Sequence, residues 1–362
     1  MSLTLLLHGK HAGSAVTYEP LGPWLLPWRF RDTAAEYETL RTATGLLDGS
    51  TQALIEVQGA DRADFLHRLL TNDIARLAPG GGCRACLLDA SAKLIADLVV
   101  LADPDRLWLL CDLTRAEIVA QTLTRYLFSE QVTVANHERR QAVLALQGPR
   151  TMELLAHVIG TVISVPADGD HVAASLHEIP LRLVRHAVAG GVGVWCLVDA
   201  ADAETVWGLF RDEGQRFGLR LVGWDALNTA RIEAGLPWWG LDMDETNLLP
   251  ETGLERAVVS ETKGCYLGQE IIARMQTYGS PSKKLMGLVL EGDETPSRGD
   301  RIRRDGEELG HVTSACRSPV LKRPIAMGYV KRGAYEPGTV VEIVRGEGRL
   351  SATVAARPLA GA

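Results

Sequence analysis

The chain has 362 residues, more than one hydrophobic core usually organises, so two or three domains are expected. Its formal net charge of −7 excludes the positive excess of a general nucleic-acid-binding surface. No apolar run approaches the roughly 20 residues of a membrane helix, no secretory signal is recognisable, and six cysteines are scattered along the chain. We therefore expect a cytoplasmic protein with reduced thiols that binds neither membranes nor nucleic acid.

Two segments of the chain share one pattern, in which a strand leads through a Gln–Gly pair into a helix. The pairs stand at residues 58–59 and 147–148, and apolar residues recur at helical spacing after each. Between them, CRACLLDA, LIADLVVLAD and LWLLCD read as three successive strands, followed by a helix. The repetition predicts two similarly built mixed α/β units, without the βαβα alternation of a doubly wound sheet.

The residue pattern of the sequence changes after Pro281, where short predicted strands alternate with turn residues. Asp305–Gly306 is a hairpin signal within this region. We therefore predict an α+β fold with three domains. The first is discontinuous, residues 1–46 with 140–280; the second is 47–139; and a C-terminal antiparallel β-barrel covers 285–362.

The stretch KGCYLGQEIIAR, residues 263–274, sets one thiol directly ahead of a predicted helix. The helix N-terminus and the nearby Lys263 would both favour the thiolate of Cys265, which makes it a candidate reactive residue. The alternative is a loop–helix junction in which this small side chain fills a gap under Tyr266. Both interpretations stay open on the residues alone.

A second cysteine motif, Cys83 and Cys86, runs into an apolar strand and lacks a second ligand pair. Residues three apart in a strand point to opposite faces, so we expect neither a redox nor a metal role. The nine histidines show no ligand spacing either, and no metal site is predicted.

Charged residues inside apolar segments supply the other candidates. Asp97 lies within the strand LIADLVVL and must face a polar cavity or a partner, because burying it unpaired would cost several kcal/mol. Arg231, near a helix end, could grip a carboxylate or a heteroaromatic ring. The trio Asp242, Asp244 and Glu245 lacks calcium-loop spacing and reads as a solvated turn.

The stretch at 263–274 resembles the signature K-G-C-[YF]-x-G-Q-E of the folate-binding YgfZ proteins, which act in iron–sulfur cluster assembly and repair. That group is similar to the glycine-cleavage T-protein, an aminomethyltransferase dependent on tetrahydrofolate, and most of this chain resembles it too. The resemblance implies two α+β domains and the barrel arranged as a ring around a central folate site. The signature residues are Lys263, Gly264, Cys265, Tyr266, Gly268 and Gln269, with Glu270 and Arg274 on the helix.

The resemblance also assigns roles to residues. Asp97 falls on the catalytic aspartate of T-proteins and Arg231 on the arginine next to their pterin site. Three departures stand beside these matches: Arg84 replaces a tyrosine, Ser50–Thr51–Gln52 lacks a histidine, and AVAGGVGVW puts Trp195 where a pterin-clamping glutamate is expected. We expect the cofactor-binding set to be Asp97, Arg231, Trp195 and Arg84.

Two functions follow from the resemblance. One is a tetrahydrofolate-binding protein of iron–sulfur cluster assembly or repair, with Cys265 as its reactive thiol and iron–sulfur proteins as partners. The alternative is a tetrahydrofolate-dependent aminomethyltransferase, in which Asp97 assists transfer from a lipoyl carrier protein. The retained Asp97 and Arg231 favour the alternative, whereas the lost tyrosine and glutamate oppose it.

Overall fold

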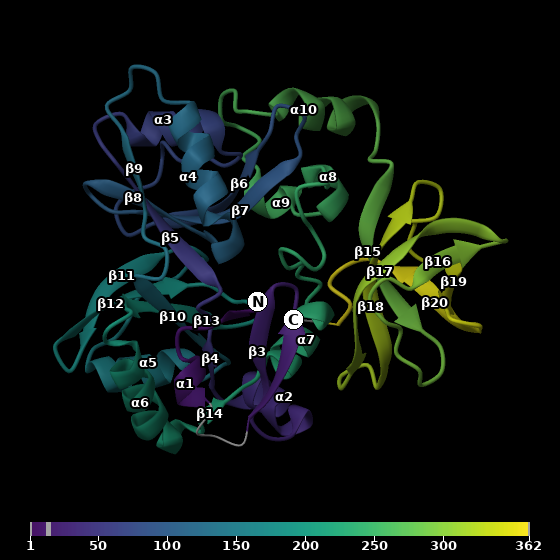
Figure 1. Cartoon of the computed structure of the whole chain (residues 1–362), viewed down its shortest axis with the longest axis horizontal. Coiled ribbons are helices and arrows are strands. Elements are labelled where there is room, and N and C mark those ends of the chain that lie inside the picture. Colours follow the sequence, from purple (N-terminus) through teal and green to yellow (C-terminus); the bar gives the residue numbers. More distant parts are fainter. Residues whose placement is uncertain (1, 12–15, 361–362) are drawn as a thin grey trace.

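Antiparallel pairing dominates the chain, because strand segments follow one another with short turns between them. In the computed structural model, which describes residues 2–11 and 16–360, the strands form three sheets and one closed barrel. Figure 1 shows the two larger sheets stacked on one side of the molecule and the barrel on the other.

A six-stranded sheet with the order β11-β12-β13-β10-β4-β14 organises the first unit. Helices α5 and α6 pack on one face of it through an apolar cluster that includes Leu144, Leu154 and Phe210. Helix α7 packs against α2 and against β3 of the small sheet β1-β3-β2. The elements are β1 Leu3–Thr4, α1 His8–His11, β2 Thr17–Leu21, β3 Trp24–Arg29, α2 Thr33–Thr42, β4 Gly45–Asp48, β10 Gln141–Gln147, α5 Thr151–Ile159, β11 His171–Leu176, β12 Ile179–Arg185, β13 Gly193–Asp199, α6 Ala203–Gly214, η2 Gln215–Phe217, β14 Arg220–Leu221 and α7 Trp224–Glu233.

A five-stranded sheet with the order β6-β7-β8-β5-β9 organises the second unit. Alternation along β7 decides where its side chains point, since Leu94, Ala96 and Leu98 are buried while Ile95 and Asp97 are only partly covered. The period of two thus turns Asp97 away from the apolar core. The elements are β5 Gln52–Gln58, α3 Arg62–Leu69, β6 Gly82–Leu88, β7 Leu94–Ala102, β8 Arg106–Asp112, η1 Leu113–Arg115, α4 Ala116–Arg125 and β9 Thr133–Asn136.

The C-terminal strands close into an antiparallel barrel in the order β15-β18-β17-β16-β19-β20. Asp305 and Gly306 form its β16–β17 turn with φ of 52° and 82°, the left-handed pair that a two-residue hairpin requires. Short helices connect the barrel to the rest of the chain. The elements are α8 Leu249–Thr252, α9 Glu255–Val258, α10 Gln269–Tyr278, β15 Lys283–Leu290, β16 Arg301–Arg304, β17 Glu307–Ser318, β18 Arg323–Lys331, β19 Val340–Arg345 and β20 Gly348–Ala355.

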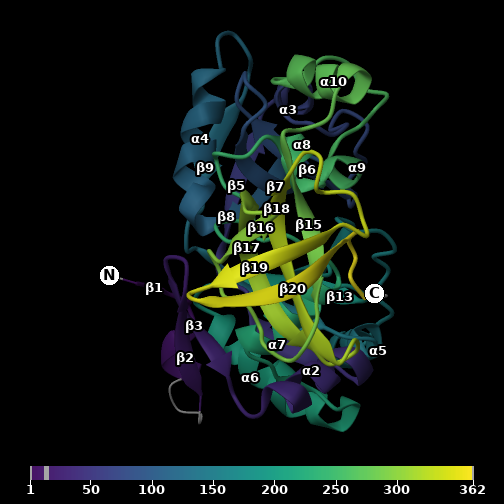
Figure 2. The same ribbon diagram turned by 90° about the vertical axis from the view of Figure 1, so that its right-hand side faces the viewer.

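The three parts are tied together by polar contacts as well as by packing. Asp103, in the β7–β8 turn, accepts two hydrogen bonds of 2.7 Å from Arg182 of β12 and so joins the two larger sheets. Glu233 at the end of α7 accepts hydrogen bonds from Tyr37 of α2 and Ser318 of the barrel. The view turned by 90° shows the barrel strands lying across the side of the stacked sheets (Figure 2).

The predicted fold class, α+β with two mixed α/β domains and a C-terminal antiparallel barrel, is confirmed. The domain boundaries given above stay a prediction. Within residues 2–11 and 16–360, none of the helices is long and apolar enough to cross a membrane.

Candidate active site

A cavity of about 500 Å³ lies where the two larger sheets face each other. Strands β5 to β8 line it from one side and β4, β10, β12 and β13 from the other, and the segment 236–241 covers it. Five of the eight tryptophans are part of its wall, so the cavity can enclose a flat heteroaromatic ring. They are Trp24, Trp195, Trp224, Trp238 and Trp239.

Asp97 and Arg84 form the charged part of the wall. They stand on the same face of neighbouring strands, because Arg84 pairs in register with Val99, two residues beyond Asp97. Arg84 Nη2 donates a 2.7 Å hydrogen bond to Asp97 Oδ2, and the negative charge of Asp97 raises the pKa of Arg84. Asp97 Oδ1 is buried and has no hydrogen-bond partner among the described residues. One carboxylate oxygen is therefore held in place while the other remains without a donor.

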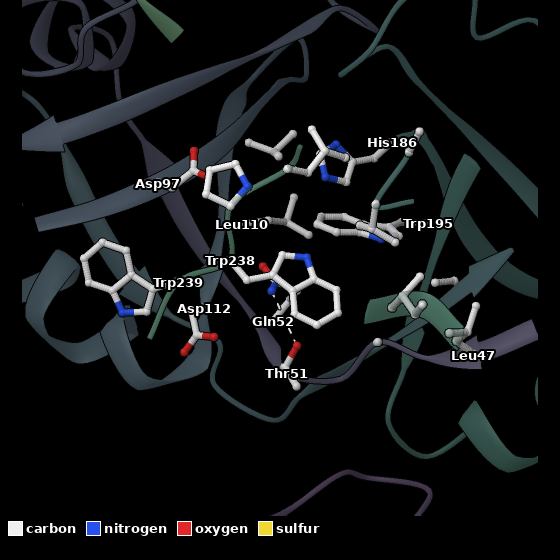
Figure 3. Close-up of a pocket in the computed structure, with 18 of the residues that line it drawn as sticks. Leu47, Thr51, Gln52, Asp97, Leu110, Asp112, His186, Trp195, Trp238 and Trp239 are labelled. Atoms are coloured by element: carbon white, nitrogen blue, oxygen red, sulfur yellow. Dashed lines mark hydrogen bonds between the residues drawn. The ribbon is translucent and has the colours of Figure 1, made fainter. Parts of the chain in front are cut away.

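Trp195 and His186 form a second wall group, contributed by β13 and by the end of β12. Their ring centroids lie 4.1 Å apart, and His186 Nδ1 lies 3.2 Å from Asp168 Oδ1. Figure 3 shows Asp97 and the His186–Trp195 pair toward opposite sides of the cavity, with Trp238 below them in that view. Trp195 thus lines the cavity as the resemblance implies.

Asp112, Thr51 and Gln52 lie together in another part of the wall (Figure 3). Burial raises the pKa of Asp112, although its carboxylate accepts hydrogen bonds from the backbone and hydroxyl groups of Thr114. Thr51 and Gln52 belong to the segment where the resemblance implies that a histidine is missing. Their hydroxyl and amide groups keep this end of the cavity polar.

Arg231 is fully buried but does not line the cavity. All five of its N–H groups are used, by Asn228, the Leu236 carbonyl, Asp242 and Ser314. Its guanidinium lies 4.7 Å from the ring centroid of Trp238, a cavity residue. Arg231 is therefore not available for the predicted direct contact with a pterin. It is instead placed to position Trp238.

The prediction of a solvated turn at residues 242–245 is wrong for Asp242, which is fully buried. Its carboxylate accepts hydrogen bonds from Arg231, from Thr313 (2.6 Å) and Ser314 (2.7 Å) of the barrel, and from the Trp238 backbone (3.0 Å). A buried charge requires such a complete set of donors. The pair Arg231–Asp242 thereby fixes the segment that covers the cavity.

The signature stretch anchors itself on the second unit. Lys263 Nζ donates to the carbonyls of His67, Leu70 and Asn72, where α3 ends, and burial lowers its pKa to about 8. Its ammonium is thus engaged by the end of α3, which places it as a helix C-cap. The role predicted for Lys263, stabilisation of the Cys265 thiolate, is therefore replaced by binding of these three carbonyl groups.

The rest of the stretch divides into packed and exposed residues. Gly268 has φ of +82°, and a Cβ there would lie 2.8 Å from the Asp89 carbonyl, so the chain needs glycine at this contact. Tyr266 is buried and its N–H donates to Gln269, whereas Gly264 and Cys265 are exposed. The remaining pair, Glu270 and Arg274, forms an exposed 2.9 Å ion pair on α10.

Cys265 is not part of the wall of the cavity. Its thiol is instead at the surface, so the interpretation as a buried filler under Tyr266 is wrong. Cys83 and Cys86 are opposite Val100 and Asp97, an odd spacing that turns them to opposite faces, and burial raises the pKa of both thiols. No cluster of metal-ligating side chains is found among the described residues.

Sequence reasoning missed His186, Asp168, Trp238, Trp239 and Asp112 as cavity residues. The two tryptophans were visible in the sequence as an adjacent pair after a helix, which is an uncommon arrangement for a solvated turn. His186 and Asp168 belong to turn regions flanking β11 and β12, where polar residues are ordinary. The β12–β13 pairing brings His186 to Trp195, and only the packing of the two sheets brings Asp168 close to Arg84.

Comparisons with known proteins find family matches along most of the chain. The family described as "GCVT N-terminal domain" matches residues 7–262, and "Glycine cleavage T-protein C-terminal barrel domain" matches residues 283–360. An aminomethyltransferase of Synechococcus sp. (strain CC9311) is 29% identical over 346 residues, covering 92% of both chains. One of Geobacillus thermodenitrificans (strain NG80-2) is 30% identical over 344 residues, 93% of this chain and 92% of the relative.

A solved structure shows the same fold. Glycine cleavage system aminomethyltransferase T from Bartonella henselae aligns over 99% of this chain and 98% of its own, with a TM-score of 0.88 and 24% identity. The T-protein matches cover both the sheets that enclose the cavity and the barrel behind it. The chain therefore belongs to the glycine-cleavage T-protein family.

Proposed function

We propose that the cavity binds tetrahydrofolate, with the reduced pterin among the tryptophans and against Asp97. The observation that carries this proposal is the buried Asp97 Oδ1 without a donor. A buried carboxylate oxygen gains most from an N–H donor, and a reduced pterin presents several along one edge. The cavity volume and its aromatic wall suit a bound heteroaromatic ring.

We propose further that the reaction is aminomethyl transfer, the activity for which the relatives are named. When bound, tetrahydrofolate supplies the nitrogen atoms that accept the one-carbon unit from a lipoyl carrier protein. Asp97 would hold the pterin edge and place negative charge where positive charge develops during transfer. Arg84 fixes the rotamer of Asp97 through its 2.7 Å hydrogen bond and so orients the free oxygen.

A second candidate function is a role in iron–sulfur cluster assembly or repair, as in YgfZ proteins. The observation that favours it is the exposed Cys265, in a signature stretch that lies between the residues matched by the two family descriptions. A single cysteine cannot hold a cluster unaided. Partner iron–sulfur proteins would have to supply the remaining ligands.

The test begins with titration of tetrahydrofolate against tryptophan fluorescence. Asp97→Asn should weaken binding roughly 10- to 100-fold, because a charged hydrogen bond is worth about 1.5–3 kcal/mol. Asp105→Asn is the control, an exposed carboxylate in the turn after β7, and should bind like the wild type. Equal affinity of Asp97→Asn and wild type would contradict the binding proposal.

Turnover of an aminomethylated lipoyl carrier then separates the two candidates. Transfer at ordinary enzyme rates supports the first. Binding without transfer supports the second, and it should be accompanied by failure of Cys265→Ser to restore iron–sulfur enzymes in a deficient strain. Full complementation by Cys265→Ser would rule out a role for that thiol.

A further inference from the structure

Among the described residues that line the cavity, His186 is the one histidine. Its backbone is fixed on both sides, since its N–H donates to the Gly193 carbonyl (3.0 Å) and its carbonyl accepts from Gln147 Nε2 (3.2 Å). Its side chain is 13% exposed. The ring therefore has few other positions available.

Asp168 is brought to this ring by a close backbone contact between the two sheets. Gly169 packs on the start of β6 so tightly that a Cβ there would lie 2.7 Å from the Gly82 carbonyl carbon. Burial raises the pKa of Asp168, but the hydrogen bond and charge of His186 and the charges of Arg84 and Arg185 outweigh this effect. The pKa of Asp168 is therefore lowered. Asp168 is thus a carboxylate at neutral pH, and these are the charged groups that face the dyad.

An ionised Asp168 selects one tautomer of its neighbour. The carboxylate accepts a hydrogen bond, so His186 Nδ1 carries the proton and Nε2 keeps its lone pair. No described residue is a hydrogen-bond partner of Nε2. The cavity consequently offers a basic nitrogen as well as the carboxylate of Asp97.

We propose that His186, oriented by Asp168, is the proton-transferring residue of this cavity, an inference that rests on the proposed aminomethyl transfer. In that transfer the carrier C–S bond and the C–NH₃⁺ bond break, and two new C–N bonds form to tetrahydrofolate. The two folate nitrogens lose one proton each; one proton ends on the carrier sulfur and the other converts ammonia to ammonium. Nε2 of His186 accepts one of these protons and returns it to the departing ammonia.

Trp195 supplies a readout that does not require turnover. A protonated imidazole quenches a neighbouring indole, so the fluorescence of the free protein should show a step on acidification. His186→Gln should lack the step. His177→Gln is the matched control: His177 lies 2.9 Å from Glu213 but is 58% exposed and outside the cavity, so the step should be unchanged.

In the transfer assay, His186→Gln should bind tetrahydrofolate within about threefold of wild type and turn over roughly 100- to 1,000-fold more slowly. A fluorescence step that persists in His186→Gln, or turnover at the wild-type rate, overturns the proposal. If the wild type binds tetrahydrofolate but does not transfer the aminomethyl group, the proposed reaction is wrong. The pH dependence of tetrahydrofolate affinity then tests whether His186 exchanges a proton with the ligand. A dependence that vanishes in His186→Gln supports proton exchange with the ligand, whereas the same dependence in both proteins overturns it.

Discussion

Replacement of Arg231 by methionine tests whether this residue positions the cavity wall or contacts the ligand. Arg231 and Asp242 are both 0% exposed, and the substitution leaves the Asp242 carboxylate buried without its cation. Removing one partner of a buried ion pair typically costs about 3–5 kcal/mol. Asp242 would retain three donors, Thr313, Ser314 and the Trp238 N–H, so we expect the lower end, about 3 kcal/mol.

The double variant Arg231→Met/Asp242→Asn should recover part of that loss. The amide oxygen of an asparagine can still accept the Thr313 and Ser314 hydrogen bonds without a buried charge, and only the Trp238 N–H loses its acceptor, so we expect a coupling free energy of about 1–2 kcal/mol. Arg274→Met is the surface control, since its ion pair with Glu270 is 66% and 82% exposed, and it should leave stability unchanged. Urea unfolding followed by circular dichroism measures the wild type, the single variants Arg231→Met and Asp242→Asn, the double variant and the Arg274→Met control.

Tetrahydrofolate affinity of Arg231→Met completes this test. Trp238 loses the cation packed 4.7 Å from its ring, and we expect affinity to fall about tenfold together with the loss of stability. Unchanged stability would refute the buried-pair argument. Unchanged stability with abolished binding would instead show that Arg231 contacts the ligand directly.

Three further predictions concern groups outside the cavity. Cys265 should be the one thiol that reacts rapidly with a disulfide reagent in the native protein; fast reaction of Cys265→Ser would contradict its assignment as exposed. Burial raises the pKa of Asp103, but hydrogen bonds from Arg182 and its other neighbours hold it at about 2, below the unfolded value of about 3.9. Its contribution of roughly 2 kcal/mol should be present above pH 4 and lost toward pH 2, and Asp103→Asn should flatten this dependence in urea unfolding. Gly268→Ala should cost roughly 1–3 kcal/mol through its positive φ and its contact with the Asp89 carbonyl, whereas Gly264→Ala, with open space, should be neutral in the same assay.

Local patterns predicted the strands and the barrel well, because each depends on residues close in sequence. The alternation around Asp97 was enough to turn its side chain out of the apolar core. Asp305–Gly306 adopts the turn that its residue types favour. These features need no information about distant parts of the chain.

Asp242 shows why the rest could not be predicted. Its donors include Thr313 and Ser314, which lie 71 and 72 residues further along, on a different domain. A sequence pattern of three acidic residues in a turn carries no trace of such partners. The same holds for Lys263, whose ammonium binds carbonyl groups 191 to 196 residues earlier in the chain.

Two of the three departures that the resemblance implies, Arg84 and Trp195, are connected in space, and this connection helps to distinguish an altered site from a lost one. Arg84 bonds to Asp97 and lies near enough to Asp168 to lower its pKa, Asp168 holds His186, and the His186 ring contacts Trp195. Independent loss of function would leave buried polar atoms unpaired at each changed position, since nothing would select for their partners. Here Arg84 is paired with Asp97 and His186 Nδ1 with Asp168, while Oδ1 of Asp97 remains without a donor in the same wall. A wall that keeps its carboxylate and rebuilds the groups around it fits retained ligand binding with altered proton chemistry better than a relic of a lost site.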